Sequence, residues 1–106
     1  MDFQALYNQK KSTPEQCLEL IHSGDTIGVA GDCNEPRALL RLLHPIAPRV
    51  EDVAVFIGAH GHYDFVTADN MHGHFNTAGF FYGSDWLMGH PKRNVSYIPA
   101  DLCDFG

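Results

Sequence analysis

The sequence predicts an α/β fold in which flanking helices cover a largely parallel sheet, and three observations lead to that prediction. Two short apolar runs rich in β-branched residues, at 26–30 and 53–57, are typical of strands buried on both faces. Between them, residues 36–44 carry leucines at helical spacing behind Pro36, which suits the first position of a helix. Strand, helix and strand over this length form a βαβ unit, which should cross over in the right-handed sense.

The residues before the first strand predict two helices. Asp2 can cap a short helix at the start of the chain. Thr13 can cap a second helix over 13–22, and Gln16 stands where it completes a capping box. Gly24 supplies the left-handed residue that ends this helix before the strand begins.

The second half of the chain predicts a long loop followed by two more strands. Residues 58–76 are polar, glycine-punctuated and rich in histidine, and a loop of that length in a compact domain is usually functional or mobile. Strands are expected at 77–82 and 95–98, with a short helix capped by Ser84 between them. We expect a sheet edge and an apolar face to remain open near the last strand, which favours a homo-oligomer.

The composition of the chain restricts the partners it can be expected to bind and the cellular compartment in which it is expected. With 106 residues, the chain is expected to form a single domain, 1–106. A net charge of −6 with only 7 Lys and Arg argues against nucleic acid and anionic membranes as partners. No apolar run approaches the ~20 residues that span a bilayer. The three cysteines lack C-x-x-C spacing and the start resembles no secretory signal, so we expect a cytoplasmic protein with reduced thiols.

The segment that follows the first strand is the leading candidate for a binding site. The glycines at 28 and 31 allow close approach of a backbone or a ligand, and a helix start after a strand offers free N–H groups and a favourable dipole. The candidate ligand-binding residues are Gly31, Asp32, Cys33, Asn34, Glu35 and Pro36. The residues alone also allow an ordinary βα turn here, with Cys33 as an inert thiol.

These residues carry a resemblance to a known family. Residues 28–36, Gly-Val-Ala-Gly-Asp-Cys-Asn-Glu-Pro, look like the glycine-rich coenzyme A loop of class I CoA-transferases, in the acetyl-CoA hydrolase/4-hydroxybutyrate CoA-transferase branch. Further points of likeness, in the same order along the whole chain, are Met1-Asp2-Phe3 with Leu6-Tyr7, the turn at 21–25, Ala38-Leu39, His74-Phe75, Phe80-Phe81 and Tyr97-Ile98-Pro99. The resemblance implies a CoA-transferase-like fold, of which this chain would be a partial N-terminal domain.

The resemblance also implies a function. Members of the family move CoA between small carboxylic acids such as acetate, 4-hydroxybutyrate or butyrate, through a glutamyl-CoA thioester. The implied ligands are acyl-CoA and small carboxylates, CoA is a substrate, and no covalently bound cofactor is expected. Members are several times longer, and their catalytic glutamate lies well beyond residue 106. No catalytic residue is therefore assigned in this chain.

Histidines suggest a second function. His60, His62 and Asp64 follow the second predicted strand, and His72 and His74 come later in the same loop. H-x-H-x-D after a strand resembles the metal motif of the metallo-β-lactamase fold, although that family continues with histidine where this chain has a phenylalanine. A small zinc-dependent hydrolase is thus one alternative, and a non-catalytic binding module is another. The histidines can equally be hydrogen-bonded or solvated loop residues, so no metal ligand is assigned.

We expect the 106-residue chain alone to show no CoA-transferase activity, because the segment with the nucleophilic glutamate is absent and loss of a covalent nucleophile removes the reaction path. Transfer between acetyl-CoA and butyrate, measured with the purified chain, checks this. Steady turnover at an ordinary enzymatic rate of ~1 s⁻¹ or more would contradict it.

Overall fold

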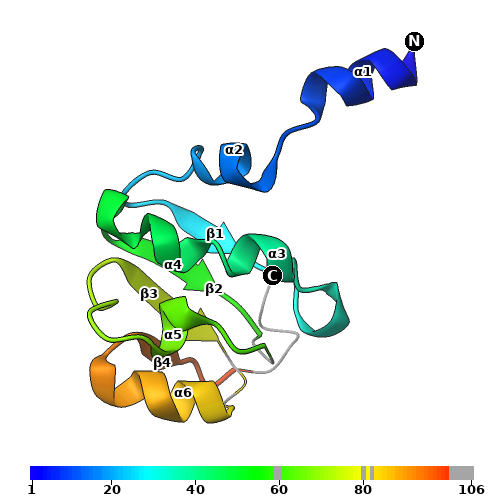
Figure 1. Cartoon of the computed structure of the whole chain (residues 1–106). Helices are drawn as coiled ribbons and strands as arrows, with labels where there is room; N and C mark the ends of the chain where they lie inside the picture. Colours follow the sequence, from blue (N-terminus) through cyan, green and yellow to red (C-terminus); the bar gives the residue numbers. More distant parts are fainter. Residues whose placement is uncertain (59–60, 80, 82, 101–106) are drawn as a thin grey trace.

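The computed structural model describes residues 1–58, 61–79, 81 and 83–100, and it confirms an α/β fold with a parallel sheet (Figure 1). The strands are β1 (Thr26–Gly28), β2 (Val53–Phe56), β3 (Phe75–Gly79) and β4 (Val95–Tyr97). The α-helices are α1 (Phe3–Lys10), α2 (Pro14–Leu18), α3 (Arg37–Leu40), α4 (Leu43–Ile46), α5 (Asp64–Thr67) and α6 (Ser84–Gly89). Single 3₁₀ turns occupy Asp32–Asn34, Ala47–Arg49 and His90–Lys92.

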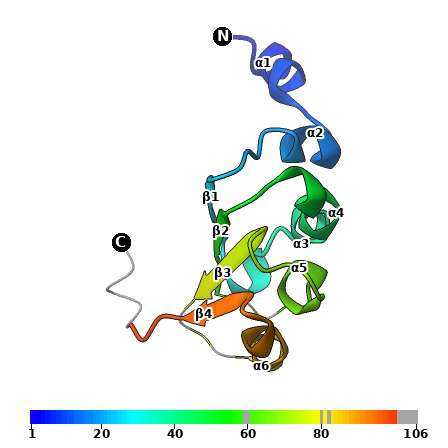
Figure 2. The ribbon, with the colours of Figure 1, turned by 90° about the vertical axis from the view of Figure 1, so that its left-hand side faces the viewer.

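The four strands lie side by side in the order in which the chain makes them. The sheet order is β1-β2-β3-β4, and every neighbouring pair is parallel. Ile27 pairs with Val55, which pairs with Thr77. Because each crossover steps in the same direction, right-handed connections place all the connecting helices on one face of the sheet. Figure 2 shows that arrangement, with α2 to α6 on one side of the strands.

The hydrophobic core lies between this covered face and the helices. Val53, Val55 and Phe75 point into it from the sheet, and each is 0% exposed. Phe65 of α5 and Trp86 of α6 close the core from the helical layer. Burial of these side chains supplies most of the favourable free energy that holds the two layers together, at ~25 cal/mol per Å² of apolar surface.

None of the helices in the described residues lies on the opposite face of the sheet, and this corrects the expectation of strands buried on both faces. Along β2, Ala54 and Phe56 are half-buried while their neighbours are fully buried. The strand β1 lies at a sheet edge, where Thr26 and Gly28 are exposed. Sequence reasoning treated both apolar runs as central strands, but the edge position of β1 leaves its alternate residues in solvent.

The N-terminal helix caps before the first strand agree with the sequence prediction. The Asp2 carboxylate accepts hydrogen bonds from the first turn of α1. Thr13 and Gln16 form the predicted capping box of α2. Gly24 adopts the predicted left-handed conformation, with φ of 83°, but the prediction that it ends this helix was wrong, because the C-cap of α2 is Glu19. The helix α2 is shorter than the predicted 13–22, since it ends at Leu18.

The single helix predicted over 36–44 is two helices, α3 and α4, and this prediction was wrong in two respects. Pro36 is the residue before α3 and not its first residue. A continuous helix would also need Pro45 to donate an N–H to the Arg41 carbonyl, which proline cannot do. The chain therefore turns at residues 41–42 and restarts at Leu43, with Pro45 inside the first turn of α4.

Three further boundaries differ from the sequence prediction. The loop at 58–76 contains α5, whose Phe65 and Val66 are buried. Strand β3 starts at Phe75, two residues before the predicted 77–82, of which positions 80 and 82 lie outside the described residues. Ser84 is the first residue of α6, while Gly83 takes the capping position without a side-chain cap.

The described helices are all too short or too polar to cross a membrane. The helix α1 extends away from the sheet (Figure 1) and buries none of its residues. At the other end of the described chain, β4 forms the second sheet edge, and Tyr97 on it is 51% exposed. An uncovered sheet face and an exposed edge strand are features that favour association with another chain.

We expect the chain to associate with itself, because an all-parallel sheet needs cover on both faces and the described residues cover one. Sedimentation equilibrium over a range of concentrations should give a mass that rises to that of a dimer or more. Tyr97→Lys, which places a charge on the edge strand, should shift the equilibrium toward monomer, while Gln9→Lys on α1 should not. A monomer at every concentration would contradict the expectation.

Candidate functional site

The candidate site lies at the carboxyl ends of the strands, where described residues that follow β1 and β2 contact each other and the start of α6. In open parallel sheets this edge is the usual place for ligands, since helix starts and loop side chains converge there. The loop after β1 holds the predicted residues 31–36, and the loop after β2 holds the predicted histidines at 60 and 62. The structure therefore brings two segments together that the sequence suggested separately.

The contact between these two loops is a buried hydrogen bond. The Tyr63 hydroxyl donates to Glu35 Oε2 at 2.6 Å. The Glu35 side chain is 0% exposed and the Tyr63 residue is 3% exposed. Arg37 Nε lies 3.9 Å from the same carboxylate oxygen and brings a positive charge to it. A buried carboxylate needs such partners, because burying a bare charge is very costly.

The environment of Tyr63 keeps its hydroxyl protonated. Burial, the hydrogen bond to Glu35 and the negative charge of that carboxylate raise the pKa of Tyr63 from 10.0 to about 12, although Arg37 and Arg41 act in the opposite direction. Gly61 is required beside this ring, since a Cβ on it would lie 2.5 Å from the Tyr63 hydroxyl oxygen. The tyrosine is thus a fixed, neutral hydrogen-bond donor at neutral pH.

A second pair links the loop after β2 with α6. His62 Nδ1 lies 2.5 Å from Asp85 Oδ1, and the Asp85 side chain is 10% exposed. The His62 side chain is 82% exposed, so the imidazole is held at one end and open to solvent over most of its surface. A carboxylate oxygen is a hydrogen-bond acceptor, so this contact fits the tautomer of His62 that carries its proton on Nδ1.

A pocket of about 180 Å³ opens beside these pairs and is positively charged. Its lining residues are Arg37, Arg41, Gly61, His62 and Tyr63. The two guanidinium groups supply forked donors that match carboxylate or phosphate oxygens, and the Tyr63 ring adds an apolar wall. Although the whole chain carries a net charge of −6, this pocket favours an anion.

Of the six predicted residues of the glycine loop, the five whose side chains are described do not line this pocket. Gly31, Asn34 and Pro36 are exposed, and Cys33 is an exposed free thiol. The side chain of Asp32 lies outside the described part of the chain. Glu35 turns inward to Tyr63, so its role is to position the neighbouring loop. Sequence reasoning did not select Arg37, Arg41, Tyr63 or Asp85, because their partners come from distant segments.

The predicted histidines do not gather at one place. His60 lies outside the described residues, and Asp64 is the exposed first residue of α5. His72 and His74 precede β3, so they lie at the amino ends of the strands, whereas His62 lies at the carboxyl ends. Their Nδ1 atoms contact the carbonyls of Arg93 and Val50 at 3.1 and 2.8 Å, respectively. Within 1–58, 61–79, 81 and 83–100, no three His, Cys, Asp or Glu side chains are grouped to hold a metal ion.

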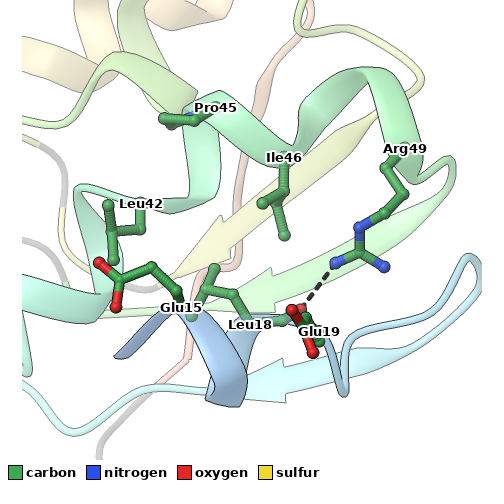
Figure 3. Close-up of a pocket in the computed structure, with 7 residues that line it drawn as sticks. All are labelled: Glu15, Leu18, Glu19, Leu42, Pro45, Ile46 and Arg49. Carbon is green, nitrogen blue, oxygen red and sulfur yellow. Dashed lines mark hydrogen bonds between the residues drawn. The ribbon is translucent and has the colours of Figure 1, made fainter. Parts of the chain in front are cut away.

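A second pocket, of about 260 Å³, lies between α2 and the region around α4 (Figure 3). Its apolar walls come mainly from Leu18, Leu42, Pro45 and Ile46, and the carboxylates of Glu15 and Glu19 stand at its rim. Arg49, the remaining lining residue, donates to the Leu18 carbonyl at 2.7 Å. This guanidinium is engaged with the backbone at the end of α2, and the pocket presents no combination of groups suited to catalysis.

Comparison with known proteins supports the fold of the chain but does not assign the chain to a family. No family model matches the sequence, and no curated protein matches it. Among solved structures, RipA from Yersinia pestis matches with a TM-score of 0.76 at 24% identity, over 96% of this chain and 26% of that chain. Two single-substitution variants of RipA match with TM-scores of 0.80 and 0.81, at 24% and 26% identity. The chain spans about a quarter of the length of these structures.

We expect Tyr63→Phe to lower the free energy of unfolding by ~1–3 kcal/mol, because it removes a donor from the buried Glu35 carboxylate while keeping the ring. Urea denaturation at neutral pH measures this, and Tyr7→Phe on the exposed helix α1 is the matched control.

The same tyrosine should make stability depend on pH in the alkaline range. Its proton dissociates near 10.0 in the unfolded chain and near 12 in the folded one, so the unfolded chain binds fewer protons between these values. The contribution of Tyr63 to the free energy of unfolding should therefore be fully present below pH 10.0 and be lost as the pH rises toward 12. A slope that is the same in the wild type and in Tyr63→Phe would contradict this assignment.

Proposed function

We propose that this chain is the opening α/β unit of an enzyme of the acetyl-CoA hydrolase/4-hydroxybutyrate CoA-transferase type, which moves CoA between small carboxylic acids. The observation that carries the proposal is the cationic pocket at the carboxyl edge of the sheet, built by the loops after β1 and β2. In this proposal the pocket binds the carboxylate that exchanges CoA, and the adjoining glycine loop at 31–36 faces the acyl-CoA thioester.

The chemistry of the pocket supports a small carboxylate as ligand. Arg37 and Arg41 can each offer two parallel N–H donors to a carboxylate, an arrangement that gives both affinity and orientation. The volume of about 180 Å³ suits an acid of the size of acetate or butyrate better than a nucleotide. The Tyr63 ring can then contact the aliphatic part of such an acid.

The order of sequence motifs is the second line of support. The loop at 28–36 and the further matching points occur in the order of the CoA-transferase family along the whole chain. The solved structures that the chain matches are longer proteins, of which the match covers about a quarter, and this is compatible with a chain that forms one unit of a longer enzyme. In this proposal CoA and acyl-CoA are substrates, no covalent cofactor takes part, and the partners are small acids and further copies of the chain.

The proposed mechanism gives the described residues binding and positioning roles. The nucleophile of the family is a glutamate carboxylate, which attacks the thioester and forms a glutamyl-CoA thioester, and no described residue is assigned that role. Glu35 holds Tyr63, and Tyr63 and the two arginines hold the acid. Backbone N–H groups of the loop at 31–36 are suited to stabilise the thioester oxyanion.

We expect isothermal titration with butyrate to show binding that Arg41→Gln weakens by roughly tenfold or more, since a charge-assisted hydrogen bond contributes ~1.5–3 kcal/mol. Lys10→Gln on the exposed helix α1 removes the same charge and should leave the affinity unchanged. The titration is repeated with CoA and with zinc as separate ligands.

The outcomes separate the candidate functions. Binding of both butyrate and CoA, with the loss in Arg41→Gln, supports the proposed function. One equivalent of zinc bound by the wild type and lost in His62→Ala would support the zinc-dependent hydrolase instead. If neither butyrate nor CoA binds, the proposed function fails.

A further inference from the structure

One ring nitrogen of the histidine in the cationic pocket is hydrogen-bonded, and the other makes no hydrogen bond to a described residue. His62 Nδ1 is hydrogen-bonded to Asp85 Oδ1 at 2.5 Å, and His62 lines the pocket. In the described part of the chain, Nε2 makes no hydrogen bond. With a proton fixed on Nδ1, the neutral ring carries its lone pair on Nε2 and can accept a proton there.

The environment of Asp85 favours the tautomer of His62 that carries its proton on Nδ1. It lies in the first turn of α6, the residue is 8% exposed, and its second oxygen, Oδ2, is buried without a hydrogen-bond partner among the described residues. A carboxylate with one of its oxygens unsatisfied depends strongly on the imidazole at the other, because an uncompensated buried charge is costly. The pair therefore orients the ring.

The charges around the pair favour an anion close to Nε2. Arg37 and Arg41 line the same pocket, on α3 and just after it, and Tyr63 contributes a neutral hydroxyl that is already donated to Glu35. Nearby cations lower the pKa of a thiol and stabilise the thiolate, which is the reactive form. An imidazolium formed at His62 adds a third positive charge to the two guanidinium groups.

We propose that the His62–Asp85 pair transfers the proton of the CoA thiol, a role that rests on the proposed function of the pocket. When free CoA binds, Nε2 accepts the thiol proton and sulfur keeps the bonding electron pair, which gives a thiolate beside an imidazolium. When a carboxylate attacks the thioester, the C–S bond breaks toward sulfur and Nε2–H returns the proton to it. His62 is the proton-transfer residue and Asp85 is its positioning residue.

The test uses the thiol end of CoA as a separate probe. Pantetheine is titrated into the wild type, His62→Gln, Asp85→Asn and His72→Gln, and the ultraviolet absorbance of the thiolate is recorded at neutral pH. His72 is the matched control, since it is an exposed histidine whose Nδ1 contacts a backbone carbonyl at the other edge of the sheet. Nitrogen chemical shifts of the labelled imidazole report which ring nitrogen carries the proton.

The wild type and His72→Gln should show a thiolate fraction about tenfold above that of free pantetheine, which corresponds to a pKa lowered by ~1 unit. The excess should vanish in His62→Gln and fall in Asp85→Asn, and a smaller share of the Asp85→Asn rings should carry the proton on Nδ1, because an amide can donate to this nitrogen as well as accept from it. These results would support the proposal, whereas pantetheine that binds with the same thiolate signal in wild type and His62→Gln would overturn it. If butyrate and CoA bind but this signal is absent, the proton-transfer role fails while the proposed function stands.

Discussion

The site depends on one topological constraint, which is that four parallel strands follow one another across the sheet in chain order. Each connection must then return the chain from the carboxyl edge to the amino edge on the same face, so the helices form a single layer. Every segment that leaves a strand starts at the carboxyl edge, and the segments after β1, β2 and β3 there form the contacts of Tyr63 with Glu35 and of His62 with Asp85. The same constraint leaves the second face of the sheet without helices from the described part of the chain.

The core and the site are joined through α5 and α6. Phe65 lies two residues after Tyr63, its ring stacks on the tyrosine ring with 5.7 Å between centroids, and it meets Phe75 edge-on. Trp86 stands directly after Asp85 and is 1% exposed. The polar side chains of the site are thus neighbours in sequence of the most deeply buried aromatic residues. Packing of the core fixes the backbone from which the site side chains project, and this limits how far they can move.

The sequence predicted correctly the features that depend on neighbouring residues. It did not predict the features that depend on contacts between distant residues. The capping box at Thr13 and the left-handed conformation of Gly24 need only their own neighbours, and both were predicted, although Gly24 does not end α2. The break between α3 and α4 is also local, and attention to Pro45 could have found it. The hydrogen bond between Glu35 and Tyr63 joins residues that are 28 positions apart. Only the strand order makes them neighbours, and a single sequence does not contain that order explicitly.

The positions of the two hydrogen-bonded pairs of the site both follow from the geometry of the loop after β2. Tyr63 has an extended backbone, with φ of −135° and ψ of 132°, and consecutive residues of an extended segment point to opposite sides. The loop leaves the strand that lies between β1 and β3. Tyr63 therefore reaches the loop after β1, at Glu35, while His62 reaches the helix after β3, at Asp85. Because one short segment is tied on both sides, the arginines near Glu35 and the histidine near Asp85 are held around a common pocket, and a change in either pair should be felt by the other.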